Sequence, residues 1–258
     1  MRLFPREVYL AWLASAPMKS EQRLALMKQE KDIGELHEAV FHGEWAPFRP
    51  VLSDKLLSDL RSNGEEKYLK TWQRVMERED ISALVYGEQG YPEALASLQD
   101  PPAILFYRGN PSALEKTCAA MVGSRNASWK GLTAADKVAR ELSEHGISII
   151  SGLAHGIDAA AHQGCLKGGS PTIAVLGCGL DRNYPAENAG LKQQILDQGG
   201  LLLSEYAPGD KPLGWHFPIR NRIITGLADC LIMIEARIRS GSMTSVQHAL
   251  DQGRDIFS

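Results

Sequence analysis

Several short segments that join apolar runs to helical patterns combine glycine, hydroxyl and arginine residues, a mixture that suits an anion. The first is Gly123-Ser124-Arg125, which follows the apolar run 118–122 and precedes a helical pattern. Glycine lets the main chain approach a ligand closely, the N–H groups of a helix start attract phosphate, and arginine adds a planar fork of donors. The alternative is an ordinary turn with a solvated arginine. The segment lacks the G-x-G-x-x-G spacing that is typical of dinucleotide enzymes.

A second segment, 151–158, places Gly152 and a further glycine at another corner between a strand and a helix. His155, Asp158 and His162 follow with the spacing i, i+3 and i+7, near one face of a helix. This spacing allows a metal site, but an acid in the first helical turn also complements the helix dipole. Capping and packing explain the same residues, so we expect no bound metal.

The third segment, 177–185, contains Tyr184 followed by a proline, and Asn188 and Lys192 come shortly after it. A nucleobase can stack on a tyrosine ring, a contact worth about 1–3 kcal/mol per base. The alternative is a tyrosine-proline turn whose ring is half buried.

The best physical indication of a bound anion is Arg220-Asn221-Arg222, at the expected start of a helix. Two cations at the positive end of a helix are unfavourable unless an anion lies beside them. A fifth segment, 235–244, contains Arg239-Ser240-Gly241-Ser242 and offers N–H and hydroxyl donors at another corner. The five segments contribute the arginines Arg125, Arg182, Arg220, Arg222, Arg237 and Arg239. So many arginines in a chain of net charge −3 indicate a polyanion or a multiply phosphorylated ligand.

The elements between these segments predict an open, mostly parallel sheet. From residue 117 onward, fully apolar runs alternate with single helical patterns, as in a sheet that helices cover on both faces. In such doubly wound α/β domains, ligands bind at the carboxyl ends of the strands, where the strand order reverses. The segments above follow those strands, so we expect them at one edge of the sheet. The apolar runs are 118–122, 147–150, 172–176, 201–203 and 230–234.

Ahead of this region, residues 1–75 predict a small all-helical module, and residues 76–258 predict an extended Rossmann-like domain. Ser20 is expected to cap one helix without a full capping box, Ser53-Asp54 to begin another, and Asn63-Gly64 to end it. The expected helices lie near 8–13, 24–27, 36–40, 56–60 and 68–79, and short strand candidates lie at 81–85 and 104–107.

Composition and missing motifs exclude several classes of protein. Hydrophobic residues make up 44% and charged residues 23%, as in globular domains, and no apolar stretch is long enough to cross a membrane. Four scattered cysteines and the lack of a signal peptide predict a cytoplasmic protein with free thiols. No P-loop, zinc-protease or serine-hydrolase motif occurs, so we expect a binding protein without a cofactor rather than an enzyme.

Together, the five segments resemble the DNA-processing protein A family, also called DprA or Smf. The resemblance covers about residues 85–258 with its motifs in order, and the helical part matches only in position and character. The matching motifs are Val122-Gly123-Ser124-Arg125, Ser151-Gly152-Leu153-Ala154 with Gly156-Ile157-Asp158, Ala174-Val175-Leu176-Gly177 with Gly179-Leu180 and Tyr184-Pro185, Phe217-Pro218 with Arg220-Asn221-Arg222-Ile223-Ile224, and Arg239-Ser240-Gly241-Ser242.

The resemblance implies an extended Rossmann domain that binds single-stranded DNA, protects it from nucleases and loads RecA onto it during natural transformation. It also implies a homodimer, and a SAM-like or helix-hairpin-like module in the helical part. Carried over by position, Gly123, Ser124 and Arg125 hold backbone phosphates, and the segments 220–222 and 240–242 line the same pocket. The other residues expected at the DNA are Gly152, Tyr184, Asn188, Lys192 and Arg239.

The sequence departs from the family pattern in three places. Ala186-Glu187 occupies positions where the family often has a lysine, so either Lys192 substitutes or the affinity is lower. Met243-Thr244-Ser245 replaces a more usual run of leucine, a small residue, threonine and alanine. The chain ends at Phe257-Ser258, within the expected last strand, where the family commonly continues into a winged-helix-like domain and often has its dimer surface.

Two other functions stay open on the same fold. One is an enzyme similar to nucleoside-monophosphate phosphoribohydrolases, although the equivalent stretch 239–247 lacks the catalytic glutamate of that group. The other is a sensor of a nucleotide second messenger, which would prefer a mononucleotide to oligo-dT.

Overall fold

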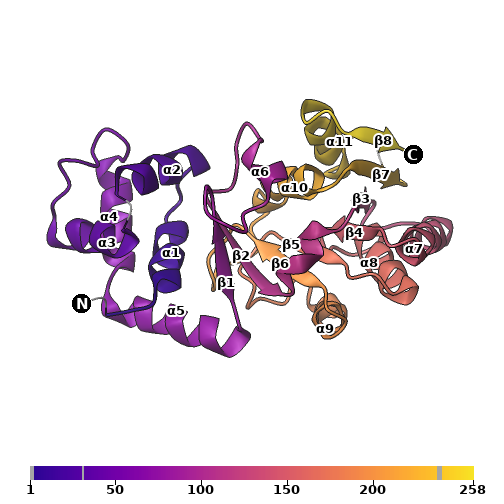
Figure 1. Ribbon diagram of the computed structural model, residues 1–258, viewed down its shortest axis with the longest axis horizontal. Helices are drawn as coiled ribbons and strands as arrows, with labels where there is room; N and C mark the ends of the chain where they lie inside the picture. Colours follow the sequence, from indigo (N-terminus) through magenta and orange to yellow (C-terminus); the bar gives the residue numbers. More distant parts are fainter. Residues whose placement is uncertain (1–2, 31, 237–239) are drawn as a thin grey trace.

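A helical region leads into a mixed sheet in the computed structural model, which describes residues 3–30, 32–236 and 240–258 (Figure 1). The helices are α1 (Arg6–Ser15), α2 (Ser20–Gln29), α3 (Ile33–His42), α4 (Asp54–Asn63), α5 (Glu66–Glu79), α6 (Glu93–Ala96), α7 (Trp129–Glu144), α8 (Ile157–Gly168), α9 (Ala189–Asp197), α10 (His216–Leu227) and α11 (Ser242–Asp251). The strands are β1 (Ser82–Val85), β2 (Ile104–Gly109), β3 (Cys118–Gly123), β4 (Ser148–Ser151), β5 (Ile173–Leu176), β6 (Leu201–Ser204), β7 (Cys230–Ile234) and β8 (Asp255–Phe257). Two short 3-10 helices cover Pro111–Glu115 and Ala186–Asn188.

The first five helices form the expected all-helical region, and polar contacts define their ends. The Ser53 hydroxyl accepts from the N–H of Leu56 at 3.3 Å, and α4 ends before Gly64, as predicted. The prediction for Ser20 was wrong. The N-cap of α2 is Lys19, whose N–H donates to the Gln22 side chain at 3.1 Å. Ser20 lies inside α2 and instead binds the main chain of the distant segment 101–103.

The sheet has the strand order β1-β2-β6-β5-β4-β3-β7-β8, and the six strands from β6 to β8 in this order run parallel to one another. The strands β1 and β2 join antiparallel at the edge next to β6. From β3 the chain proceeds outward through β4, β5 and β6, and then returns to place β7 on the other side of β3. The strand order therefore reverses between β3 and β7, and the predicted extended Rossmann-like sheet is confirmed.

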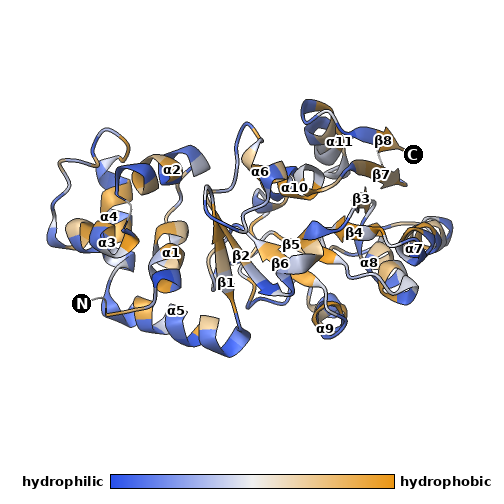
Figure 2. Ribbon diagram, in the orientation of Figure 1, coloured by the Kyte–Doolittle hydropathy of each residue, from blue (hydrophilic) through white to orange (hydrophobic). Residues whose placement is uncertain are grey.

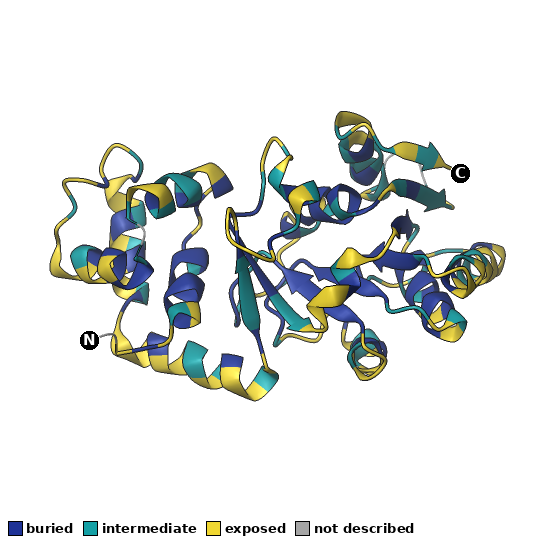
Figure 3. Ribbon diagram, viewed as in Figure 1, coloured by how far each residue is buried: buried dark blue, intermediate teal, exposed yellow. Residues whose placement is uncertain are grey.

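Helices cover both faces of the sheet, which explains why its central strands are apolar throughout. Alternate residues of β3 point to opposite faces: Ala120 packs in one cluster with Ile223 of α10, and Met121 packs in another with Ala139 of α7. The strands and inward helix faces are hydrophobic and buried, whereas the outer faces of α5 and α7 are hydrophilic and exposed (Figures 2 and 3). Along the described ranges, no helix is both long and apolar enough to span a membrane.

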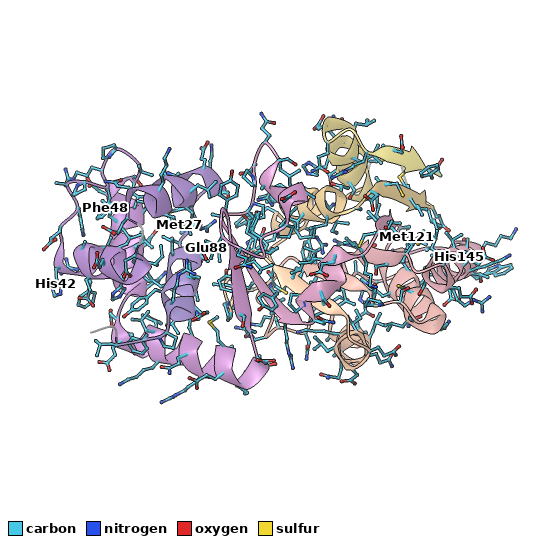
Figure 4. All side chains as sticks on the ribbon, in the orientation of Figure 1. Met27, His42, Phe48, Glu88, Met121 and His145 are labelled. Carbon is cyan, nitrogen blue, oxygen red and sulfur yellow. The ribbon has the colours of Figure 1, made fainter. Side chains whose placement is uncertain are left out.

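The helical region and the sheet region share one hydrophobic core. A single cluster of buried residues extends from Trp12 in α1 to Phe106 in β2 and Leu202 in β6. Arg6 donates to Glu88 Oε2 at 2.9 Å, and Figure 4 labels Glu88 between the helices and the sheet. A boundary between residues 75 and 76 would divide α5, so we propose the end of α5 at Glu79 as the place where the two parts meet.

Candidate functional site

Two adjoining cavities lie at the carboxyl ends of the strands, where the strand order reverses. The larger, of about 490 Å³, is bounded by the segments that follow β3 and β7 and by the start of α10. The smaller, of about 360 Å³, lies beside the segments that follow β4 and β5. Both are lined by Arg125, Ala154, Tyr184 and Phe217, so we call them together the double cavity. It brings together residues from all five segments that the sequence singled out.

Arg125 lies at the meeting point of the two cavities, in the field of the buried Asp158 carboxylate but without a direct ion pair in the described residues. The side chain is exposed, and no hydrogen bond or ion pair to it is found in the described part of the chain. Its Cζ lies 5.2 Å from the centroid of the Phe217 ring, and that ring stacks on Tyr184 with centroids 5.5 Å apart. A cation over one aromatic ring, next to a second ring that is 42% exposed, suits a phosphate and a base.

The loop that carries Arg125 is held by close packing. A Cβ atom on Gly123 would lie 2.0 Å from the carbonyl oxygen of Ile234, so only glycine fits between β3 and β7. The Ser124 carbonyl accepts from the N–H of Ile157 at 3.2 Å, and the Ser124 N–H donates to the Glu235 carbonyl at 2.9 Å. These contacts fix the loop against the start of α8 and against the segment that follows β7.

Side chains of the protein already bind part of the start of α7, where we expected free N–H groups for a phosphate. The Glu235 carboxylate accepts from the Ser128 N–H at 2.8 and 3.0 Å and from the Ser128 hydroxyl at 2.6 Å. Ser128 is the N-cap of α7, and its hydroxyl also accepts from the N–H of Gly131 at 3.2 Å. A carboxylate of the protein thus already occupies the positive end of this helix.

Arg220 forms the buried floor of the larger cavity. Its guanidinium donates to the carbonyls of Gly152 and Val175 and lies in the field of the buried Asp158 carboxylate. Burial lowers the pKa of Arg220 to about 10 and raises the pKa of Asp158, while each charge favours the ionised form of the other. Gly152 leaves the space that this pair needs, since a Cβ there would lie 2.6 Å from the Arg220 guanidinium.

Three buried polar atoms without a hydrogen-bond partner in the described residues belong to side chains that line the larger cavity. They are Arg220 Nε, Ser240 Oγ and Ser245 Oγ. Buried polar atoms are nearly always paired in folded proteins, so three such atoms in residues around one cavity mark its wall as unusually polar. Nearby, the Ser242 hydroxyl donates to the Gly123 carbonyl at 2.7 Å, and Asn221 donates to the Gly241 carbonyl at 3.3 Å.

Arg222 does not line the double cavity, contrary to prediction. Its side chain is 8% exposed, points to the opposite side of α10, and pairs with Glu205 at 2.9 Å and Asp100 at 3.2 Å. The reason is geometric, because residues two positions apart on a helix do not share a face. Acidic residues of the protein balance Arg222, so the pair of arginines was not by itself a sign of a missing anion.

Other predicted residues also lie away from the cavity surface. Lys192 is buried, and its ammonium donates to the carbonyls of Leu180 at 2.6 Å and Arg182 at 2.9 Å. The Arg182 guanidinium donates to the Gly209 carbonyl at 2.8 Å. Asn188 donates to the Leu153 carbonyl at 2.9 Å and so supports the cavity wall from behind. Arg237 and Arg239 lie outside the described residues.

The residues with metal-ligand spacing serve the structure separately. The His162 Nδ1 lies 2.8 Å from Thr172 Oγ1, and burial lowers the pKa of His162 to about 3. The Asp158 carboxylate accepts from the Gly152 N–H at 3.1 Å, whereas His155 lies 3.5 Å from Glu187. Within the described ranges, no group of three or more histidine, cysteine and acidic residues could hold a metal ion.

Sequence reasoning missed Phe217, Ser245 and Glu235 as residues of this site. The position of Phe217 just before Pro218, at the start of a helix that carries two arginines, was the available signal for an aromatic contact. Ser245 lies one turn into α11, so only its burial at the larger cavity distinguishes it from an ordinary helical serine. The role of Glu235 can be recognised only from the pairing of β3 with β7, which brings it to Ser128.

A family model described as DNA recombination-mediator protein A matches residues 82–258. The DNA processing protein DprA of Streptococcus pneumoniae is 47% identical over 168 residues, which are 65% of this chain and 59% of that protein. DprA of Bacillus subtilis is 35% identical over 212 residues, which are 81% of this chain and 71% of that protein. The chain thus spans 59% of the length of the S. pneumoniae protein.

Two solved structures resemble this one over most of the fold. The X-ray structure of S. pneumoniae DprA matches with a TM-score of 0.80 and 32% identity, covering 98% of this chain and 86% of that chain. A DprA structure from Helicobacter pylori, which describes the single-stranded DNA binding mode of that protein, matches with a TM-score of 0.62 and 33% identity. It covers 68% of this chain and 79% of the H. pylori chain.

Proposed function

Because this chain belongs to the DNA-processing protein A family, we propose that it binds single-stranded DNA in the double cavity. The observation that carries the proposal is the exposed guanidinium of Arg125, which has no direct ion pair in the described residues and lies between the two cavities and over the Phe217 ring. The H. pylori relative supports it, since that protein has a described single-stranded DNA binding mode.

In this proposal, the larger cavity takes a phosphate and the smaller one an adjacent base. Arg125 supplies donors to the phosphate, and the buried Arg220 supplies a fixed positive charge below it. The base stacks on the exposed part of Tyr184. Single strands are preferred because the bases of a duplex are already stacked on one another and cannot reach the ring.

We further propose that the protein is a recombination mediator rather than an enzyme. It would protect incoming single strands during natural transformation and help to load RecA, as a cytoplasmic homodimer. The support is the family match and the four cysteines, all free thiols. Asp158, the carboxylate that lines the larger cavity, is engaged by main-chain N–H groups and Arg220, as a structural acid would be.

The test is the affinity of labelled oligo-dT for Arg125→Ala, measured by fluorescence anisotropy at two salt concentrations. We expect a loss of about tenfold or more, because a charged hydrogen bond to phosphate is worth roughly 1.5–3 kcal/mol. The slope of log affinity against log salt should fall by about 0.7, the value for one phosphate contact on a single strand.

Arg140→Ala is the matched control, since Arg140 is a half-exposed arginine on α7 that pairs with Glu144 at 3.6 Å. It should bind oligo-dT as the unmodified protein does. Unchanged affinity in Arg125→Ala would contradict the assignment of the double cavity. Stronger competition by a mononucleotide than by unlabelled oligo-dT would instead favour a nucleotide sensor.

A further inference from the structure

Beside the double cavity, the surface carries an aromatic side chain to which the proposed function gives no role. Trp129, the first residue of α7, is 71% exposed, more than any other aromatic residue that the structure describes. No ring partner or cation for it is found in the described part of the chain. Tryptophan buries roughly 150–250 Å² when it is covered, so an uncovered ring is a candidate for a binding contact.

Trp129 lies outside the cavity, where DNA that extends beyond the cavity could reach it. Residues 124–126 form one wall of the larger cavity, and Trp129 follows this wall after two further residues. Lys130, the next residue, is also exposed. A single DNA strand that leaves the cavity over this wall would therefore meet an indole ring and an ammonium group at the start of α7.

The charges at the start of α7 favour a base over a phosphate at this place. The Glu235 carboxylate already binds the N-cap residue Ser128 and would repel a phosphate there. An uncharged base that stacks on Trp129 avoids this repulsion, and Lys130 can neutralise the phosphate that follows it.

We propose that Trp129 stacks on a base of the DNA outside the double cavity, and so extends the binding site onto the first turn of α7. The proposal rests on the proposed function, because it requires a single strand in the cavity. It adds a contact that only a strand longer than the cavity can make.

The test compares an oligo-dT of about 4 nucleotides with one of about 16, the range that single-strand binding folds cover. Trp129→Ala should lower the affinity for the long oligonucleotide by about fivefold to a hundredfold and leave the affinity for the short one unchanged. The conservative variant Trp129→Phe should keep most of the affinity for the long strand, and Trp129→Ala should leave the salt slope unchanged. Tyr68→Ala is the matched control, because Tyr68 is an exposed ring on α5 beside a lysine and should affect neither length.

The outcomes separate this proposal from the function on which it rests. If Arg125→Ala weakens both lengths and Trp129→Ala weakens neither, the double cavity binds DNA and the extension over Trp129 is wrong. Equal loss on both lengths in Trp129→Ala would also overturn it, since the contact would then belong to the cavity. No binding of either length by the unmodified protein would refute the proposed function itself. The thermal midpoint of Trp129→Ala should match that of the unmodified protein, because the ring is exposed.

Discussion

Arg220 and Arg222 are two positions apart on α10, and their guanidinium groups serve opposite sides of that helix. Arg220 lies beneath the larger cavity in the field of Asp158. Arg222 forms a buried pair with Glu205, in which the two side chains are 8% and 10% exposed. A buried carboxylate that loses its cation keeps the cost of leaving water, so the Arg222–Glu205 pair matters for folding rather than for the ligand.

We expect Arg222→Ala to lower the free energy of unfolding by about 3–5 kcal/mol, because it leaves Glu205 buried and unpaired. The double variant Arg222→Met with Glu205→Leu should recover part of this loss. Urea denaturation measures both changes. At a temperature where Arg222→Ala is folded, its affinity for oligo-dT should stay within about twofold of the unmodified protein. A loss of affinity as large as that of Arg125→Ala would show that Arg222 takes part in binding.

At this scale, Arg125 and Arg220 line the double cavity and stay predicted binding residues, whereas Arg222 and Lys192 lie elsewhere. Segment composition shows which residues can bind an anion, and it placed Arg125 correctly after β3. It does not show the partners that come from distant segments. Glu205 lies 17 residues before Arg222, and the carbonyls that bind Lys192 come from a loop whose path depends on tertiary packing.

The strands β3 and β7 position the cap of α7 as well as the double cavity. Gly123 pairs with Ile234 in the parallel ladder, so the next residue, Glu235, comes within reach of Ser128. Glu235 has a φ of 49°, a left-handed conformation that few residues other than glycine adopt, and this conformation follows directly after the ladder.

Glu235→Gln should lower the free energy of unfolding by about 1 kcal/mol, because α7 loses a carboxylate at its positive end. Glu144→Gln, at the opposite end of the same helix, should change it by less than about 0.5 kcal/mol. Chemical denaturation of the two variants checks this. Equal effects at both ends would show that the charge of Glu235 does not stabilise the helix start.

The elements themselves could largely be predicted from the sequence. All five apolar runs after residue 117 became strands, because fully buried parallel strands need no alternation of polar residues. The contact of Glu235 with Ser128 could not be predicted, since the two residues are 107 positions apart and only the pairing of β3 with β7 joins them.

Considered as a whole, the molecule has a titrating group where its helical region meets the sheet region. A cavity of about 850 Å³ lies there, and Arg23 of α2 and Asp210 are among its lining residues. Burial raises the pKa of Asp210 to about 6, while the N–H of Ala207 and the charge of Arg23 act in the opposite direction.

The pKa of Asp210 sets a pH dependence that Asp210→Asn should remove. The folded protein holds this proton more tightly than the unfolded chain, so the contribution of Asp210 to stability is present near pH 4 and is lost as the pH rises through about 6. The free energy of unfolding of Asp210→Asn, relative to that of the unmodified protein, should therefore rise by up to about 3 kcal/mol between pH 4 and pH 7. Urea denaturation at several pH values measures this difference, and a difference that does not change with pH would contradict the assignment.

The hydrophobic core that joins the two regions has a consequence for genetics. Trp12 of α1 belongs to the same cluster as Leu153 and Cys178, which lie in segments that form the wall of the double cavity. Buried aromatic residues contribute several kcal/mol, a large share of the roughly 5–15 kcal/mol by which domains are stable. Missense alleles in the helical region can thus reproduce the phenotype of alleles in the double cavity by reducing the amount of folded protein in the cell. A genetic map of such alleles would cover far more of the chain than the residues that touch the ligand.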